Sequence, residues 1–237
     1  MKLKALLLAT ALVCGAPAVA SAQETTTSVN FGVASSYQFR GVTQAFDEKL
    51  DAKAQIFGGA DVSAGSFYVG TWLSNVDFGS KANLEVDLYA GYKPKVGPVT
   101  LDIGVLAYTY PQESNLLVYE GKFAGTVATE SGVSLTGSVF YSPEYGRDGP
   151  SYWYYEAAVS APIPGAKVGP FALSANASVG SLSAETSALL PDYTNWKVGL
   201  TAATEGGWAV DVFYTDTDVD NLKPFEGKGV VQLKRTF

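Results

Sequence analysis

The ionisable side chains of this chain suit electrostatic recognition better than covalent or acid–base catalysis. The 237 residues contain no histidine, and their one cysteine is Cys14. Without an imidazole there is no Ser-His-acid triad, no histidine general base and no histidine metal ligand. Carboxylates, lysines and arginines remain, and fixed charges of this kind pair with one another or attract ions. The composition therefore argues against an enzyme and predicts no cofactor and no metal centre.

One acidic run invites a calcium interpretation. Asp216, Asp218 and Asp220 alternate with other residues, and alternate carboxylates can converge on one hard cation. The run has Asn221 where an EF-hand loop needs glycine, and Gly227 where it needs the closing glutamate. We therefore interpret the run as a solvated acidic loop.

The first 22 residues have the form of a secretory signal peptide. Lys2 and Lys4 give a basic start, residues 6–13 are a short apolar run, and residues 20–22 offer a small-residue cleavage site. Cleavage would leave a mature domain of residues 23–237. Because two lysines leave, the formal net charge would change from −7 to −9. Such an acidic chain lacks the basic footprint of a nucleic-acid-binding protein.

Alternation of apolar and polar residues with a period of two dominates the mature domain. Leu84, Val86 and Leu88, for example, alternate with Glu85 and Asp87. No segment of the mature domain approaches 18 consecutive apolar residues, which excludes helical membrane spans. Twelve segments share the alternating pattern: 27–40, 52–62, 66–74, 82–93, 98–110, 115–127, 132–142, 151–161, 170–180, 193–205, 207–215 and 227–237.

The connections between these segments favour a membrane barrel over a soluble sandwich. Every second connection is mostly short, whereas the others are mostly longer and polar. Short and long connections thus alternate along the chain, and the number of strands is even. This pattern predicts an all-β, antiparallel up-and-down transmembrane β-barrel of about 12 strands, with short periplasmic turns and longer extracellular loops. Aromatic residues gather near the strand ends, where interfacial girdles are expected. Those toward the long loops are Tyr37, Phe39, Trp72, Tyr108, Tyr110, Tyr141, Tyr152, Trp153, Tyr154, Tyr193 and Trp196.

The chain ends on an aromatic residue in an alternating strand, the kind of signal that barrel-assembly machinery reads. Phe237 shares a face with Val231 and Leu233, and Arg235 interrupts this apolar face near its end. We therefore expect an outer-membrane protein surrounded by lipid and lipopolysaccharide, with the barrel-assembly machinery as a partner.

The charges divide unequally between the predicted barrel wall and the predicted long loops. Polar faces of the strands are nearly balanced, whereas the long loops hold thirteen acidic against four basic side chains. An acidic mouth attracts cations, so we expect a weak cation preference. The acidic-mouth residues are Asp47, Glu48, Asp216, Asp218 and Asp220. The candidates for the lumen and its constriction are Arg40, Glu85, Asp87, Asp102, Glu120 and Lys122.

Arg40 is the only arginine on a predicted lumen face. One hypothesis pairs it with Glu85 or Asp87 at a constriction. The alternative is an ordinary ion pair that holds two strands in register, because buried charges need partners whatever their role.

Several motifs resemble the TorF family of porin-type proteins from Gram-negative bacteria. They lie mostly in the first half of the chain, although the likeness runs from about residue 28 to Phe237. The motifs are Tyr37-Gln38-Phe39-Arg40-Gly41-Val42-Thr43-Gln44, Tyr68, Gly70-Thr71-Trp72, Ser74-Asn75-Val76-Asp77, Glu85-Val86-Asp87-Leu88-Tyr89-Ala90-Gly91-Tyr92 and Tyr108-Thr109-Tyr110-Pro111. The resemblance implies an outer-membrane barrel of porin type and transfers no substrate and no catalytic residue.

The function that these observations favour is a porin-like channel for passive diffusion of small hydrophilic solutes. A structural or adhesive barrel with a plugged lumen is the main alternative, and a soluble periplasmic β protein is a third. A barrel enzyme such as a lipid-face phospholipase usually depends on a histidine-activated serine, which this chain lacks. The solute, the pore size and homo-oligomerisation stay open.

Overall fold

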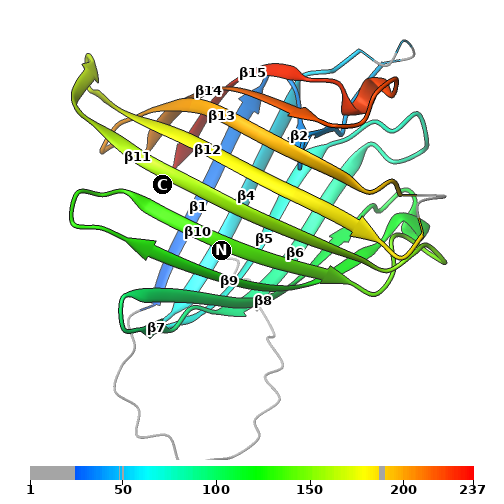
Figure 1. The fold of residues 1–237 in the computed structure, drawn as a ribbon, viewed down its shortest axis with the longest axis horizontal. Helices are drawn as coiled ribbons and strands as arrows, with labels where there is room; N and C mark the ends of the chain where they lie inside the picture. Colours follow the sequence, from blue (N-terminus) through cyan, green and yellow to red (C-terminus); the bar gives the residue numbers. More distant parts are fainter. Residues whose placement is uncertain (1–24, 48, 50, 187–189) are drawn as a thin grey trace, which may run out of the picture.

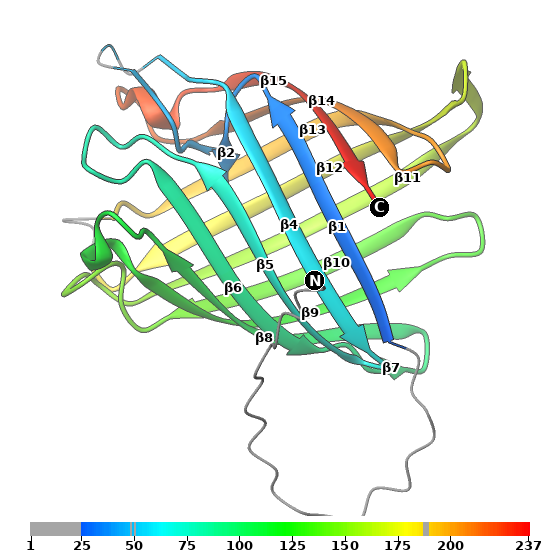
Figure 2. The same ribbon diagram turned by 180° about the vertical axis from the view of Figure 1, so that it is seen from behind.

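Twelve long antiparallel strands form a closed barrel in the computed structural model, which describes residues 25–47, 49, 51–186 and 190–237. Each strand pairs with its neighbours in the sequence, and β1 pairs with β15 to close the sheet (Figures 1 and 2). The strands are β1 (Thr25–Ala34), β4 (Gln55–Ala64), β5 (Phe67–Asn75), β6 (Leu84–Tyr92), β8 (Val99–Thr109), β9 (Val118–Ala128), β10 (Ser134–Ser142), β11 (Tyr152–Val168), β12 (Phe171–Ala184), β13 (Tyr193–Ala203), β14 (Trp208–Thr217) and β15 (Lys228–Thr236).

The alternating pattern places one apolar face of every strand outward. On β1, Val29, Phe31 and Val33 are 52%, 50% and 48% exposed, and the residues between them face the interior. A closed barrel pairs every strand edge, so its backbone groups are satisfied inside a lipid bilayer and its outer apolar side chains contact hydrocarbon. Among the described residues, no helix is long and apolar enough to cross a membrane.

The expected number of strands and the alternation of short and long connections are confirmed. The short connections lie at one end of the barrel and include Gly65–Ser66 and Gly169–Pro170, while the long loops gather at the other end (Figure 1). A two-residue strand, β7 (Lys95–Val96), lies within one short connection, and two 3₁₀ turns, η1 (Ser114–Leu116) and η2 (Lys223–Phe225), lie in long loops. The turn predicted at 162–169 is shorter than expected, because β11 continues to Val168 through an irregularity between Pro162 and Lys167.

The prediction that the first strand runs to Arg40 is wrong. Strand β1 ends at Ala34, and the chain then folds into a small hairpin of β2 (Gln38–Phe39) and β3 (Val42–Thr43). Its two turn residues, Arg40 and Gly41, have φ values of 51° and 82°, as a tight two-residue hairpin turn requires. Tyr37 and Gln44 close the hairpin through a backbone hydrogen bond of 2.9 Å. We call residues 37–44 the lumen hairpin, because its side chains contact interior residues of several wall strands.

Two facing glycines make room inside the barrel for a long side chain. Gly91 on β6 lies opposite Gly104 on β8, and a Cβ atom at either position would overlap the Tyr68 side chain. The Tyr68 hydroxyl donates a 2.7 Å hydrogen bond to the Asp102 carboxylate. The glycines therefore let one aromatic side chain cross β6 and reach β8.

This arrangement predicts that Gly91→Ala destabilises the barrel while Gly137→Ala does not. The first change forces Tyr68 out of its slot, and such overpacking costs about 1–3 kcal/mol. A Cβ at Gly137 meets nothing within 4 Å, so this variant is the matched control. The free energy of unfolding can be measured by urea titration in detergent. Equal values for the two variants would contradict the packing argument.

Candidate functional site

An ion pair between the lumen hairpin and the barrel wall lies at the centre of the site. Arg40 Nη1 and Nη2 donate to the two carboxylate oxygens of Glu120 at 2.6 and 2.9 Å. The two side chains are 7% and 0% exposed. Tyr108 and Tyr152 donate further hydrogen bonds of 2.8 and 2.7 Å to the same carboxylate. The Glu120 charge is thus met by four donors from the hairpin, β8 and β11.

Aromatic rings surround the guanidinium. Its Cζ atom lies 4.7 Å from the ring centre of Phe39, 4.7 Å from that of Phe140 and 4.0 Å from that of Tyr154. Burial alone would lower the pKa of Arg40, but the Glu120 carboxylate more than offsets this effect, so the pKa lies above its usual value. Arg40 therefore stays charged and is held by both carboxylate and ring contacts.

The turn sequence lets the hairpin approach the wall opposite Glu120. A Cβ at Gly41 would overlap Asn195 Cβ on β13 and Thr217 Cγ2 on β14, each at 2.8 Å. Glycine is needed there both for its positive φ and for this close approach. The hairpin therefore reaches across the lumen, from Glu120 on β9 to β13 and β14.

Arg40 and Glu120 come together, whereas the predicted pairing of Arg40 with Glu85 or Asp87 is wrong. Arg40 lies at the tip of an inward hairpin and not on the wall, so it reaches past β6 to β9. Glu85 instead accepts hydrogen bonds from Tyr37 at 2.8 Å and Tyr110 at 3.0 Å. Asp87 is 8% exposed, and its Oδ1 atom has no hydrogen-bond partner among the described residues.

The two remaining lumen candidates form a separate cluster nearer the short turns. Lys122 Nζ lies 2.6 Å from the Asp102 carboxylate, and Lys93 Nζ lies 3.7 Å from it. The side chains of Lys122 and Asp102 are 24% and 14% exposed, so water reaches this pair. All six lumen candidates thus lie inside the barrel, but they form more than one group.

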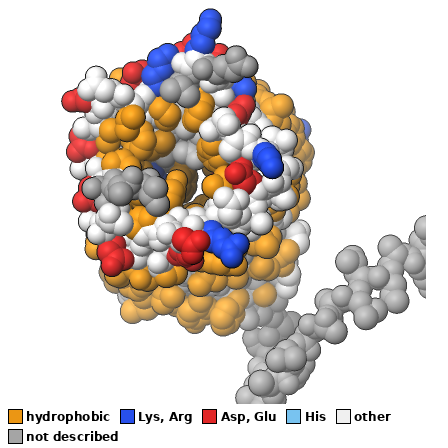
Figure 3. All heavy atoms as spheres, turned by 90° about the vertical axis from the view of Figure 1, so that its right-hand side faces the viewer, with side chains coloured by type: hydrophobic (Ala, Val, Ile, Leu, Met, Phe, Trp, Pro, Cys, Tyr) orange, Lys and Arg blue, Asp and Glu red, His pale blue; other side chains and the backbone are white. Residues whose placement is uncertain are grey.

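The acidic loop residues are partly engaged by local hydrogen bonds. Backbone N–H groups of Asp51 and Lys49 donate to the Asp47 carboxylate and hold its pKa below the usual value. Asp216 accepts from the N–H of Thr217, and Asp218 accepts from the N–H of Thr194. The side chains of Asp218 and Asp220 are exposed, and Glu48 lies outside the described residues. Figure 3 views the long-loop end, where acidic side chains lie around a central hollow.

The terminal strand keeps its apolar end against the neighbouring strands. Phe237 stacks on Phe31 with ring centres 5.9 Å apart. Arg235, which interrupts the apolar face, places its Cζ atom 4.4 Å from the Phe237 ring centre and 5.1 Å from that of Trp208. The assembly role of Phe237 stays a prediction.

Several residues predicted for the interfacial aromatic girdle lie inside the barrel instead. The inward group is buried, with exposures below 10%, while Trp153, Trp196 and Tyr141 are 44%, 42% and 38% exposed on the outer surface. The inward group consists of Tyr37, Tyr108, Tyr152, Tyr154 and Tyr193. Strand parity would have separated the wall tyrosines, because Tyr108 shares the face of Asp102 and Tyr154 shares the face of Glu156. It would have failed for Tyr37, which has the parity of the outward residues of β1.

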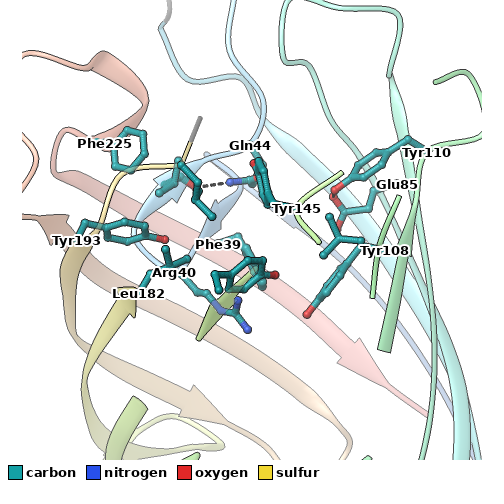
Figure 4. A pocket seen from close by; sticks show the side chains of 14 residues that line it. Phe39, Arg40, Gln44, Glu85, Tyr108, Tyr110, Tyr145, Leu182, Tyr193 and Phe225 are labelled. Carbon is teal, nitrogen blue, oxygen red and sulfur yellow. Dashed lines mark hydrogen bonds between the residues drawn. The ribbon is translucent and has the colours of Figure 1, made fainter. Parts of the chain in front are cut away.

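The lumen hairpin separates two kinds of cavity. Two cavities of about 420 and 440 Å³ lie toward the short turns, and both are lined by Gln38, Gln232 and Lys234. A cavity of about 100 Å³ lies toward the long loops and is lined mainly by aromatic and aliphatic side chains (Figure 4). We call the first two the inner cavities and the last the outer cavity.

Comparisons with known proteins support the barrel and identify the family. Residues 18–236 match a bacterial family described as a bacterial protein of unknown function (Gcw_chp), so the chain belongs to that family. A comparison with curated protein sequences gave no match.

Solved structures of porins share the fold. The KdgM porin aligns with a TM-score of 0.61 at 8% identity, covering 89% of this chain and 99% of that one. The same porin in complex with disordered oligogalacturonate aligns with a TM-score of 0.55 at 9% identity, covering 89% and 99%. The NanC porin aligns with a TM-score of 0.53 at 12% identity, covering 89% and 98%. At these identities the likeness concerns the fold.

The buried ion pair predicts strong energetic coupling between Arg40 and Glu120. Either Arg40→Met or Glu120→Gln alone should cost about 3–5 kcal/mol of unfolding free energy, because each leaves a buried group without its partner. The double variant Arg40→Met, Glu120→Gln should lose less unfolding free energy than the sum of the two single losses. A double-mutant cycle on urea unfolding in detergent measures this coupling.

Asp51→Asn is the matched control for this cycle. Its carboxylate lies 3.6 Å from Lys223 Nζ in an exposed pair, so its loss should change stability by about 0–1 kcal/mol. A cost for Arg40→Met no larger than that of Asp51→Asn would mean that the buried pair does not hold the hairpin.

Proposed function

We propose that this Gcw_chp family member is a porin-like channel of the outer membrane that passes small hydrophilic solutes by diffusion. The observation that carries the proposal is a closed barrel with an apolar outside and polar inner cavities of about 420 and 440 Å³. Asn176, Thr201 and Gln232 are among the side chains that line these cavities. A wall of this kind suits a water-filled path. The fold shared with KdgM and NanC supports the same function.

The lumen hairpin would form the constriction of this channel. It joins β9 to β13 and β14 across the lumen through Arg40 and Gly41, and it separates the inner cavities from the outer cavity. Solutes would pass beside the hairpin, where Gln38, Lys197 and Ser178 line a further cavity of about 70 Å³. The proposed solutes are therefore small.

A plugged barrel with a structural or adhesive role is the second candidate. Its support is the near-complete burial of the Arg40 and Glu120 side chains, which are 7% and 0% exposed. A hairpin packed this closely could close the lumen altogether. Conductance separates the two candidates.

Three further features of the proposed function are predictions from the sequence alone. These are the signal peptide at residues 1–22, membership of the TorF family and the assembly signal at Phe237. The absence of histidine supports a role without catalysis. Contact with lipopolysaccharide and association into homo-oligomers belong to the same proposal.

We further propose that the channel weakly prefers cations. The support is the acidic excess of the long loops, where Asp218 and Asp220 remain exposed. Fixed negative charge at a mouth raises the local concentration of cations and is screened beyond about 8 Å at physiological salt. The preference would therefore be largest at low ionic strength.

Replacing residues 37–43 by a Gly-Ser linker of equal length should raise the single-channel conductance in planar bilayers. The linker lacks the Arg40 anchor, so the inner cavities would open to the mouth. The matched control replaces residues 163–166, part of the β11–β12 hairpin at the other end, and should leave conductance unchanged. A wild-type protein that never conducts, beside a linker variant that does, would favour the plugged barrel. Absence of conductance in both would overturn the channel.

The double variant Asp218→Asn, Asp220→Asn should move the reversal potential in a KCl gradient toward zero. The wild-type potential should have the sign of potassium permeation, because the mouth is acidic. Glu130→Gln is the control, since Glu130 is an exposed acid in a short turn at the opposite end. A wild-type preference for chloride would exclude the proposed role of the mouth.

A further inference from the structure

Aromatic rings from strands and long loops line the outer cavity. Tyr193 and Phe225 lie on one side, Tyr108 and Tyr110 lie on the other, and Phe39 lies between them (Figure 4). Contacts with other aromatic rings hold several of these side chains in place. The Tyr193 and Phe225 ring centres are 5.3 Å apart, and Tyr110 packs edge-on against Phe78 at 5.6 Å. The cavity thus presents fixed aromatic side chains to its interior.

Acidic side chains outnumber basic ones beneath these rings. Arg40 is neutralised by Glu120. Glu85, which lines the outer cavity, has hydrogen bonds only from tyrosine hydroxyls among the described residues and forms no ion pair there. Asp87, two residues along the same strand, is buried and has an oxygen without a partner in the described part of the chain. Arg40 is paired with Glu120, so the carboxyl groups of Glu85 and Asp87 have no basic partner among the described residues.

Among the described residues that line the outer cavity, Arg40 is the one basic side chain. The Arg40 guanidinium lies below Phe39 in the view of Figure 4, on the side away from Gln44 and Tyr145. Its donors are directed to Glu120, and the Phe39 ring lies over its Cζ atom at 4.7 Å. The guanidinium charge in the cavity lining is therefore already paired, whereas the Glu85 carboxyl group has no basic partner among the described residues.

We propose that the outer cavity binds a small organic cation with a quaternary, fully methylated ammonium group. Such a group spreads its charge over methyl groups and donates no strong hydrogen bond, so aromatic faces replace water around it at little cost. An alkali ion would instead need several oxygen ligands. An apolar cavity of about 150 Å³ holds benzene. Tetramethylammonium is at least as large as benzene, so its head would fill the outer cavity of about 100 Å³ and reach toward the mouth, where a polar tail would follow.

This inference rests on the proposed channel for its biological meaning, but the binding itself does not require conduction. The acidic loops would raise the concentration of any cation at the mouth. Bound there, the cation would lie directly on the long-loop side of the constriction. The channel would thus select organic cations of this class.

Calorimetric titration of the folded protein in detergent with choline tests the proposal. The matched ligand is 3,3-dimethylbutan-1-ol, which has the same shape and no charge. Choline should bind saturably and at least about tenfold more tightly than the alcohol, because desolvated cation–ring contacts favour only the charged ligand. Tetramethylammonium chloride should compete with choline, and sodium chloride at the same concentration should not.

Variants locate the binding site. Tyr193→Leu and Phe225→Leu each remove an aromatic ring. Glu85→Gln removes the charge and keeps one of the two oxygens that accept from Tyr37 and Tyr110. Each should weaken choline binding by about five- to tenfold. Tyr155→Leu is the matched control, because Tyr155 is 47% exposed on the outer wall, and its binding should equal that of the wild type. Heat-modifiable gel mobility checks that each variant forms the barrel.

Two results would overturn the proposal. Equal affinity for choline and its neutral isostere would mean an apolar cavity without charge recognition, and no saturable choline binding would mean no site. Choline binding without conductance would overturn the channel and keep the site. Conductance without choline binding would support the channel and overturn the binding site.

Discussion

The buried contact between Arg40 and Glu120 is the interaction on which the interior depends. A twelve-stranded barrel is too wide for wall side chains alone to fill its lumen. This chain fills part of the space with residues 37–44, a segment with few backbone partners in the wall. The guanidinium loses its water there, and that cost is offset by the Glu120 carboxylate, with Phe39, Phe140 and Tyr154 around it. Either charged group buried without the other would be unstable, so the hairpin is held in place only when Arg40 and Glu120 are paired.

The position of the hairpin determines what the rest of the lumen can do. Toward the short turns, polar side chains such as Asn176 and Gln232 line the inner cavities, and the Lys122–Asp102 pair remains accessible to water. Toward the long loops, the hairpin presents Phe39 and Val42 to tyrosines from the wall, which gives an apolar cavity. One barrel therefore contains two cavity environments of different polarity, and the lumen hairpin is the boundary between them.

The sequence predicts the wall well and the interior poorly, for one physical reason. Period-two alternation reports which side of a strand faces lipid, so the twelve strands and the sorting of their connections could be predicted. The same alternation continues through Tyr37 and Phe39, so the hairpin resembles a continuation of β1. Only the turn at Arg40 and Gly41 distinguishes it. The partner of Arg40 depends on how far the hairpin crosses the lumen, and parity alone ranks Glu85, Asp87 and Glu120 equally.

The outer cavity and the seated hairpin share residues, and this couples them. Phe39 covers Arg40 and also borders the cavity, while Tyr108 donates its hydroxyl to Glu120 and lines the same cavity. A ligand in the cavity thus binds a surface that exists only when the hairpin is in place. By linkage, such a ligand stabilises the seated hairpin by as much as the hairpin improves the ligand's affinity. A solute recognised at the mouth would therefore strengthen the constriction that it has to pass.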